Sequence, residues 1–394
     1  MPSLTEHPNR EFEVLCLAAR LPLDDAQQRR LAASAQLDIN AEELTRLAIH
    51  HGLAPLLAHQ LHRYCPALLT QALQQYAQRN AVRVQFLTQT LVEMMQTFDA
   101  AGVPAVPLKG AALALTAYGA LGLRDFCDVD VLIHPAQLDE AESLCVAHGF
   151  ARKHDLAHTH DADVRRFRYD LAMWRARDGI LLELHWGLLF SYAGIAFERL
   201  PWWDTRESIV LNGQTLPALA PEETLLLLCL HGSKDGWDKL KHAADVAQFL
   251  RAKPGLDWPR VWQLAGAINA VQLVRIALRW ADALLDAPLP AATRTALRQD
   301  QSLREPLRHA HALLHSELAA DEKVVARQTF FLLTHRCWWE KLRYAWRYAL
   351  SPGPTEWRRV ELPASLGLVY RLLRLARLTK FYGLRWLSAA YAEK

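Results

Sequence analysis

The chain has 394 residues, of which 51% are hydrophobic and 22% are charged, and its formal net charge at pH 7 is +3. This composition is typical of globular proteins and excludes a disordered or fibrous chain. The near-neutral charge argues against a protein that binds nucleic acid over its whole surface, and the length predicts about two or three domains.

The cysteines and apolar segments predict a cytoplasmic protein. The six cysteines include no CxxC pair and most have apolar neighbours, which is typical of reduced, buried thiols. The N-terminal residues lack a basic patch followed by an apolar run, so we expect no signal peptide. No stretch reaches about 18 uncharged apolar residues, so we expect no transmembrane segment.

The first part of the chain is predicted to be helical. Apolar residues recur at helical spacing over residues 10–100. The short apolar run AVPL then predicts a strand that enters a turn at Lys109-Gly110, and AALALTAYGALG predicts a helix that ends at Gly119.

The middle of the chain predicts a sheet. DVDVLI (128–133) is a strand, and PAQLDEAESLCVAHGF that follows it is an amphipathic helix. Residues 164–186 are predicted to form two or three strands with a turn at Asp178-Gly179, and Asn212-Gly213 marks a hairpin. Together these elements predict an α/β or α+β unit of about 115 residues.

Helices are predicted to return at Pro221, which stands at a helix start with two glutamates behind it. SPGPTEW interrupts the chain near residue 351 before a last basic helix. We therefore divide the chain into an N-terminal helical domain, a sheet domain, a C-terminal helical domain and a linker with the basic helix, at residues 1–100, 101–218, 219–350 and 351–394.

Three carboxylates are the candidate catalytic groups. Alternation along a strand places Asp128 and Asp130 on one face, and LLELHW places Glu183 on another short apolar strand. Oxygen ligands suit Mg²⁺, and two ions about 3.5–4 Å apart clamp an in-line phosphoryl displacement. In that arrangement Asp128 and Asp130 bridge both ions, while Glu183 binds the first and helps to take the proton from an acceptor hydroxyl. For a D-x-D pair alone, the alternative is the wet face of a half-exposed strand.

Three segments resemble one known family. LKGAALALTAYGALGLRDFCDVDVLI, LELHW and LLLLCLHGSKDGWDKLKHAADVAQFL are similar to the uncharacterised bacterial nucleotidyltransferase family of the DNA polymerase beta-like superfamily. The resemblance runs from about residue 10 to 385. It implies an α+β fold, in which a small mixed-sheet palm is flanked by N-terminal and C-terminal helical domains. It also implies transfer of a nucleoside monophosphate from an NTP to an acceptor, with release of pyrophosphate.

The resemblance also implies roles for single residues. Asp128 and Asp130 match the paired metal-binding acids of the family, and Glu183 matches its third acid, with two Mg²⁺ ions as cofactor and Mn²⁺ as the alternative. Superfamily members carry Gly-Ser at the turn before the first palm helix, whereas this chain has Lys109-Gly110 followed by alanine. Gly110 still permits close approach of phosphate to a helix N-terminus, and Lys109 supplies charge in place of the serine.

Arg124 and His185 each have two interpretations. Arg124 either binds phosphate bidentately or pairs with Asp125 or Asp128. His185 shares a strand face with Glu183, so it either orients that acid and lines the acceptor site or is a packed, hydrogen-bonded histidine.

The helix from Pro221 carries a line of polar residues at helical spacing: His231, Lys234 or Asp235, Asp238, Lys241 and Asp245. One interpretation is the solvated face of an amphipathic helix. The family resemblance favours a domain that closes over the nucleotide, where Lys234 or Lys241 reaches the triphosphate and His231 and Asp245 brace the helix.

A histidine-rich segment and the basic C-terminal helix each have two interpretations. The histidines of HDLAHTHDAD (154–163) crowd together as in a zinc site, but a solvated or substrate-facing loop is favoured because the segment lacks cysteines and stands where a loop is expected. The last helix, with Arg371, Arg374, Arg377 and Lys380, either packs on the body with its arginines in water or lies on an anionic membrane surface.

The leading function is transfer of a nucleotide, with ATP as the default donor, to a hydroxyl of a small molecule, glycan or peptide. The second hypothesis is a transferase that modifies RNA or protein, although the weak net charge disfavours a nucleic-acid partner. The third is a nucleotide-binding or scaffold protein that has kept the fold and lost catalysis.

Overall fold

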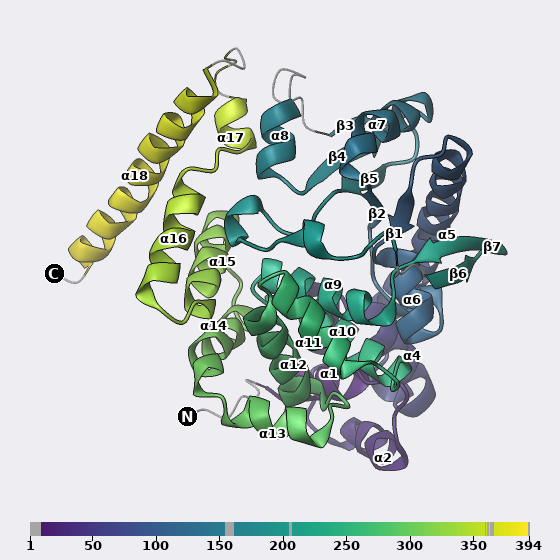
Figure 1. The fold of residues 1–394 in the computed structure, drawn as a ribbon. Helices are drawn as coiled ribbons and strands as arrows, with labels where there is room; N and C mark the ends of the chain where they lie inside the picture. Colours follow the sequence, from purple (N-terminus) through teal and green to yellow (C-terminus); the bar gives the residue numbers. More distant parts are fainter. Residues whose placement is uncertain are drawn as a thin grey trace.

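The computed structural model describes residues 9–153, 161–204, 207–358, 360, 362 and 366–392. Figure 1 shows helices packed around one mixed sheet, which confirms the predicted α+β class. Within these described residues, no helix is long and apolar enough to cross a bilayer.

The sheet has five strands in the order β1-β2-β5-β4-β3. β2 and β5 are parallel, and the other neighbouring pairs are antiparallel. The strands span Ala105–Pro107 (β1), Asp128–Ile133 (β2), Ala151–Arg152 (β3), Asp170–Arg175 (β4) and Ile180–His185 (β5). The predicted strands are therefore present, and the short edge strand β3 is added to them.

Alternation along β2 and β5 separates a dry face from a polar face. Val129, Val131, Leu182 and Leu184 belong to a buried cluster that packs against α5 (Gln71–Ala100) and α7 (Leu138–Ala147). The acidic residues of the same strands therefore project from the opposite face. The predicted site follows from this division, because one face of the sheet packs in the core and the other face carries the acids.

Local turn chemistry follows the predictions. α6 (Gly110–Tyr118) ends at Gly119, whose φ of 77° lies in the left-handed region that favours glycine. The hairpin of β6 (Glu207–Leu211) and β7 (Gln214–Ala218) turns at Asn212 and Gly213, with φ of 48° and 76°. Positive φ at both positions is what a two-residue hairpin turn requires.

One segment differs from its prediction. Residues 161–167 form the short helix α8 (Asp161–Phe167), although a strand was predicted from residue 164 onward. Val164 is its buried residue, while Arg165 is exposed and pairs with Asp139. A single apolar anchor among charged residues suits a helical turn on the surface better than a strand within the sheet.

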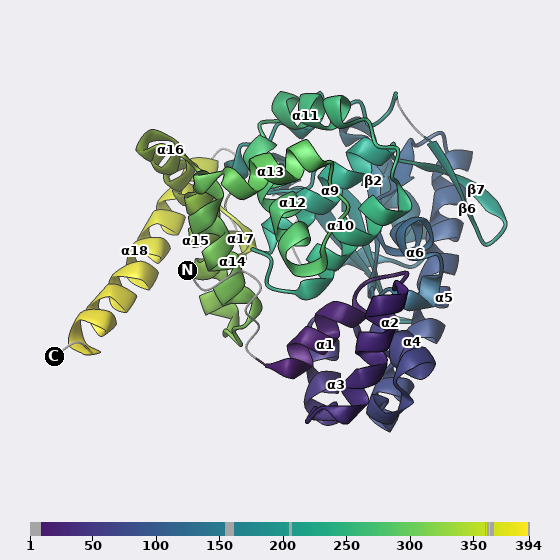
Figure 2. The same ribbon diagram turned by 90° about the horizontal axis from the view of Figure 1, so that it is seen from below.

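Helices precede and follow the sheet (Figures 1 and 2). The N-terminal ones are α1 (Arg10–Ala18), α2 (Asp25–Ala33), α3 (Ala41–His50) and α4 (Ala54–Tyr64). The C-terminal ones are α9 (Pro221–Lys234), α10 (Leu240–Ala252), α11 (Trp258–Ala267), α12 (Val271–Leu285), α13 (Ala291–Gln299), α14 (Arg304–Leu314), α15 (Ala320–Thr334), α16 (Trp338–Ala349), α17 (Pro354–Trp357) and α18 (Gly367–Ala392).

The helices share one large apolar core. Buried residues of α1, α3 and α4 belong to the same cluster as those of α9, α10 and α12, whereas much of α5 packs on the sheet. The division of the chain into four segments stays a prediction. Buried residues of α9 and α10 belong to this core, which places both helices beside the sheet.

Candidate active site

The three predicted acids meet on the polar face of the sheet. Asp130 and Glu183 are direct partners in the parallel pairing of β2 and β5, and Asp128 is two residues before Asp130 on the same face. All three line one cavity of about 280 Å³. Five further predicted site residues line it as well: Lys109, Arg124, His231, Lys234 and Lys241.

Asp130 is the most enclosed of the acids, with a side chain 1% exposed. Lys109 Nζ lies 3.2 Å from its Oδ2, and His185 Nε2 lies 2.9 Å from its Oδ1. Burial alone would raise the pKa of Asp130, but the charge of Lys109 and the hydrogen bond from His185 hold it well below its usual range. Asp130 is therefore ionised in the folded protein.

His185 lies behind the acids and does not line the cavity. Its Nε2 is 2.9 Å from Asp130 and 3.4 Å from Glu183 Oε2. Burial would lower the pKa of His185, but hydrogen bonds to both acids raise it to about 9. A protonated His185 donates to the carboxylates and fixes their orientation, so it acts as a positioning residue.

Asp128 has a different environment. Its backbone belongs to the β2–β5 pairing, but its carboxylate forms no hydrogen bond or ion pair with any residue in the described ranges. Its pKa is raised, first by the negative charge of Asp130 and then by burial. A half-buried carboxylate that is repelled by its neighbour and faces a polar cavity is suited to bind a cation.

A cation fits this corner by the chemistry of its donors. Asp130 and Glu183 each place a carboxylate oxygen within 4.8 Å of the other, with the protonated His185 behind them, and Asp128 adds a further carboxylate to the cavity. Carboxylate oxygens are the ligands that Mg²⁺ prefers, and it needs few of them from the protein when substrate phosphates supply the rest.

The turn before α6 places Lys109 and Gly110. Gly110 has φ of 49°, so a left-handed conformation explains the glycine at this helix start. The Lys109 side chain is 10% exposed and pairs with Asp130. The structure thus places the lysine between the helix start and the acids, although Gly110 itself does not line the cavity.

Arg124 pairs with neither Asp125 nor Asp128, the two acids that the sequence suggested as partners. Its Nε and Nη2 lie 2.9 and 2.8 Å from the carboxylate oxygens of Asp245 on α10, and Tyr118 donates to the same carboxylate at 2.7 Å. Asp125 instead accepts from Arg83 and Tyr76. Because Asp245 lies 121 residues away in the chain, local spacing could not reveal this pair.

α9 and α10 supply the basic wall of the cavity. Lys234 Nζ lies 5.2 Å from the centre of the Tyr169 ring, a cation–π arrangement. Lys241 enters from the start of α10. Burial, followed by Lys109 and Lys234, keeps the pKa of His231 well below its usual value, so this imidazole is neutral.

Sequence reasoning missed Tyr169 and Arg327 as cavity residues. Arg327 comes from α15 and lies 3.3 Å from Asp235 and 3.2 Å from Asp238. No local motif marks either residue, because each reaches the cavity through tertiary packing.

A model of the family described as "Uncharacterised nucleotidyltransferase" matches residues 38–286, which contain all three acids and both α9 and α10. The chain belongs to this nucleotidyltransferase family. The predicted membership is confirmed, and the protein is a nucleotidyltransferase. The family match ends at the close of α12, so α13–α18 lie beyond it.

Two solved structures resemble this nucleotidyltransferase. One is an antigenic nucleotidyltransferase-like protein from Paracoccidioides brasiliensis, with 18% identity and a TM-score of 0.32 over 53% of this chain and 96% of that one. The other is the antibiotic-resistance factor ANT(2'')-Ia, with 17% identity and a TM-score of 0.27 over 59% and 98%. These scores are too low to support an argument, and no curated protein matches.

A second group of metal-ligand type lines the same cavity of the nucleotidyltransferase. Ligand atoms of His231, Asp235 and His242 lie within 4.8 Å of one another. Asp235 is already paired with Arg327, and Lys234 adjoins it in the chain, so positive charge opposes a cation here. The histidines predicted as a loop at 154–160 lie outside the described residues.

His51 holds the start of α10, and therefore Lys241, in place. Its Nδ1 accepts from the Leu240 N–H at 3.3 Å, and its carbonyl accepts from the Lys241 N–H at 3.2 Å. Burial, followed by the charges of His50 and His315, lowers the pKa of His51 from 6.5 to about 3. The folded protein keeps this imidazole neutral while the unfolded chain protonates it.

The nucleotidyltransferase should therefore lose stability as the pH falls from 6.5 toward 3, because the unfolded chain binds the additional proton. At pH 5 this costs about 2 kcal/mol from His51 alone. His51→Asn keeps an acceptor near the Nδ1 position but cannot titrate. Urea unfolding at pH 7 and pH 5 should show a smaller acid loss in the variant, and equal losses would contradict the assignment.

Proposed function

We propose that the protein transfers a nucleoside monophosphate from an NTP, by default ATP, to a hydroxyl of a small molecule, glycan or peptide in a Mg²⁺-dependent reaction that releases pyrophosphate. The observation that carries the proposal is the meeting of Asp128, Asp130 and Glu183 at paired strands, in a cavity walled by lysines. Family membership supports the reaction class.

Asp128, Asp130 and Glu183 would hold the metal, with Mn²⁺ as an alternative ion. When bound there, two such ions would neutralise charge on the triphosphate and activate the acceptor hydroxyl. Glu183 has its pKa lowered despite burial, because His185 donates to it and outweighs the burial. It is therefore ionised and can accept the proton that the hydroxyl gives up.

In the reaction, the acceptor oxygen attacks the α-phosphorus, and the bond from that phosphorus to the bridging oxygen of pyrophosphate breaks. Lys234 and Lys241 face the cavity from the helical side and would bind the triphosphate oxygens. His185 holds Asp130 and Glu183 in place throughout. Arg124 and Asp245 lock α10 onto the sheet domain, which fixes the distance between the lysines and the acids.

An adjoining cavity of about 440 Å³ has the size of an acceptor site. It shares Tyr169, Lys234, Asp235 and Arg327 with the cavity of the acids. Its other walls carry the aromatic rings of Phe190, Tyr192, Phe331 and Tyr348. Rings beside charged groups suit a compact acceptor with hydroxyl groups, such as a small molecule or one sugar residue.

Thermal unfolding with each NTP, with and without Mg²⁺, tests the proposal. We expect one or more NTPs to stabilise the protein only when Mg²⁺ is present, by about 2.7 kcal/mol at 100 times the Kd. Asp130→Ala should remove this stabilisation. The matched control Asp282→Asn changes a buried aspartate on α12 that pairs with Arg294 outside the cavity, and it should keep the response.

The alternative is a nucleotide-binding or scaffold protein without catalysis. The enclosure of Asp130 by Lys109 and His185 favours it, because a metal must compete with both groups. NTP binding that is independent of Mg²⁺ and unchanged in Asp130→Ala would favour this alternative. An absence of any NTP response would contradict the proposed donor site.

A further inference from the structure

α16 exposes an unusual set of side chains. Trp338, Trp339, Leu342 and Trp346 are 73%, 58%, 50% and 63% exposed. Positions 338, 342 and 346 repeat every four residues, so they form one stripe along the helix. Exposing three indole rings to water is unfavourable, and monomeric proteins rarely expose an apolar patch of this kind unless it binds a partner or a membrane.

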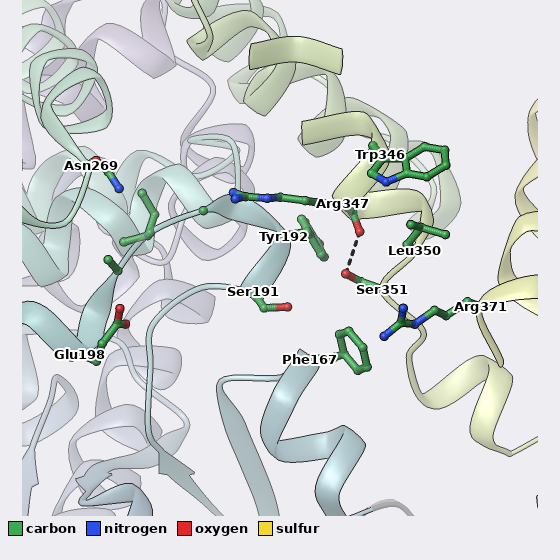
Figure 3. Close-up of a pocket in the computed structure, with 13 residues that line it drawn as sticks. Phe167, Ser191, Tyr192, Glu198, Asn269, Trp346, Arg347, Leu350, Ser351 and Arg371 are labelled. Carbon is green, nitrogen blue, oxygen red and sulfur yellow. Dashed lines mark hydrogen bonds between the residues drawn. The ribbon is translucent and has the colours of Figure 1, made fainter. Parts of the chain in front are cut away.

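The charged residues of this stripe are basic. Arg343 is exposed on α16 among the tryptophans. Arg336, just before the helix, is also exposed and lies 3.7 Å from Asp300, while Arg347 points away from Trp346 across the neighbouring cavity (Figure 3). Glu340, the acid of α16, is half-buried and accepts from the backbone N–H groups of Arg336 and Cys337, so it caps the helix. The exposed face of α16 therefore presents indoles and guanidinium groups without a balancing carboxylate from the same helix.

The prediction that the basic residues of α18 lie in water is wrong for Arg374, although Lys380 is exposed as expected. Arg374 is 7% exposed, donates to the Tyr348 carbonyl and, like Arg377, pairs with Glu356. Leu368 and Leu372 point outward and are 69% and 64% exposed. The buried carboxylate of Glu356 explains the orientation, because it attracts the arginines inward and leaves leucines on the surface.

The two helices border one cavity of about 490 Å³. Figure 3 shows Trp346 of α16, Leu350 just after the end of that helix, and Arg371 of α18 among the residues around this cavity. The exposed residues of α16, together with Leu368, Arg371 and Leu372 of α18, are hereafter called the tryptophan–arginine face.

We propose that the tryptophan–arginine face lies on an anionic lipid bilayer surface. Indole rings favour the boundary between water and hydrocarbon because the ring is apolar and its N–H is polar. Guanidinium groups bind lipid phosphates bidentately, and exposed leucines enter the acyl boundary. The combination matches a helix that lies in the plane of an interface.

A second copy of the chain fits this face less well. A twofold dimer pairs a patch with itself, so Arg343 would face its own copy without an exposed acid from α16 to neutralise it, whereas Arg336 already pairs with Asp300. An anionic lipid surface supplies the missing negative charge. Charge complementarity therefore selects the bilayer over self-association.

The cavity at this face leads toward the acids. It shares Phe167, Tyr192 and Ser351 with the cavity of about 440 Å³ proposed for the acceptor, and that cavity adjoins the one lined by Asp128 and Asp130. If the proposed transfer is correct, an acceptor anchored in the bilayer can approach the site along this line. Binding of the face to lipid does not depend on the transfer reaction.

Co-sedimentation of the full chain with vesicles tests the inference. We compare phosphatidylcholine vesicles with vesicles that also contain phosphatidylglycerol. The protein should bind the anionic vesicles at least about tenfold more tightly, because exposed basic residues are attracted to an anionic surface. High salt should weaken this preference by screening.

Two variants separate the indoles from the charges. The triple variant Trp338→Ala, Trp339→Ala, Trp346→Ala should lose binding to both vesicle types, while Arg343→Glu should lose mainly the preference for anionic vesicles. The matched control Val82→Ala, Phe86→Ala removes exposed apolar groups of α5, which are 59% and 67% exposed, and should bind as the unmodified protein does.

Unchanged circular dichroism and an unchanged midpoint of thermal unfolding would show that the variants stay folded, because the replaced side chains are exposed. Failure of the intact chain to bind either vesicle would overturn the inference, as would an equal loss in the α5 control. A concentration-dependent dimer that disappears in the triple variant, without vesicle binding, would instead assign the face to a second copy.

Discussion

Asp130→Asn should reduce nucleotidyl transfer by more than about 100-fold, because loss of a group that merely supports a metal ligand already costs about 10–100-fold. Asp130 is paired in register with Glu183 and held by Lys109 and His185, so it is central to the carboxylate cluster. Asparagine keeps one oxygen for His185 but removes the negative charge. The measurement is NTP-dependent pyrophosphate release, once an acceptor is found, and Mg²⁺-dependent NTP binding before then.

The same variant should also lose some stability. Lys109 and His185 would keep buried positive charge without the carboxylate that balances it, which costs about 1–3 kcal/mol. Asp282→Asn separates the loss of activity from the loss of stability. It removes the charge of another buried acid, which pairs with Arg294 and Arg298 outside the cavity. It should be destabilised yet active. Full activity in Asp130→Asn would exclude Asp130 as a metal ligand.

Arg124→Met should cost about 3–5 kcal/mol in the free energy of unfolding, because it leaves the buried carboxylate of Asp245 without its cation. The side chains of the pair are 7% and 3% exposed, and their contact joins the sheet domain to α10. Tyr118 still donates to Asp245 but cannot supply charge. Urea unfolding monitored by circular dichroism measures the loss.

The double variant Arg124→Met, Asp245→Leu should recover much of that stability, since replacing both members of a buried pair is far less costly than removing one. Arg46→Met provides the exposed control. Arg46 pairs with Glu43 and is 51% exposed, so its loss should cost less than about 1 kcal/mol. A double variant no more stable than Arg124→Met would show that the pair does not act as a unit.

The local features of the site followed from the sequence. Strand alternation placed Asp128 and Asp130 on one face, and the apolar strand LLELHW indicated Glu183 as the third acid, which the family resemblance then matched. The hairpin at Asn212-Gly213 and the end of α6 at Gly119 followed from backbone conformations that few residues adopt. Each of these predictions depends on neighbours within a few residues.

The remaining features depend on packing between distant segments. Arg124 pairs with Asp245 across 121 residues, and Arg327 enters the cavity from α15. The orientation of α18 depends on one buried acid, Glu356, so its basic residues alone indicated the wrong face. Periodicity identifies which residues of a helix share a side, but it does not say which side meets the body of the protein.

The parallel pairing of β2 with β5 makes activity a sensor of correct folding. A shift of one residue between these strands would turn Glu183 toward the α5 side and bring Leu182 or Leu184 to the acids. Such a misfolded chain would keep nearly all of its helical signal because the helices are elsewhere. Recovery of Mg²⁺-dependent NTP binding after refolding would therefore show that β2 and β5 are in the correct register. Circular dichroism, which measures helix content, would not detect the shift.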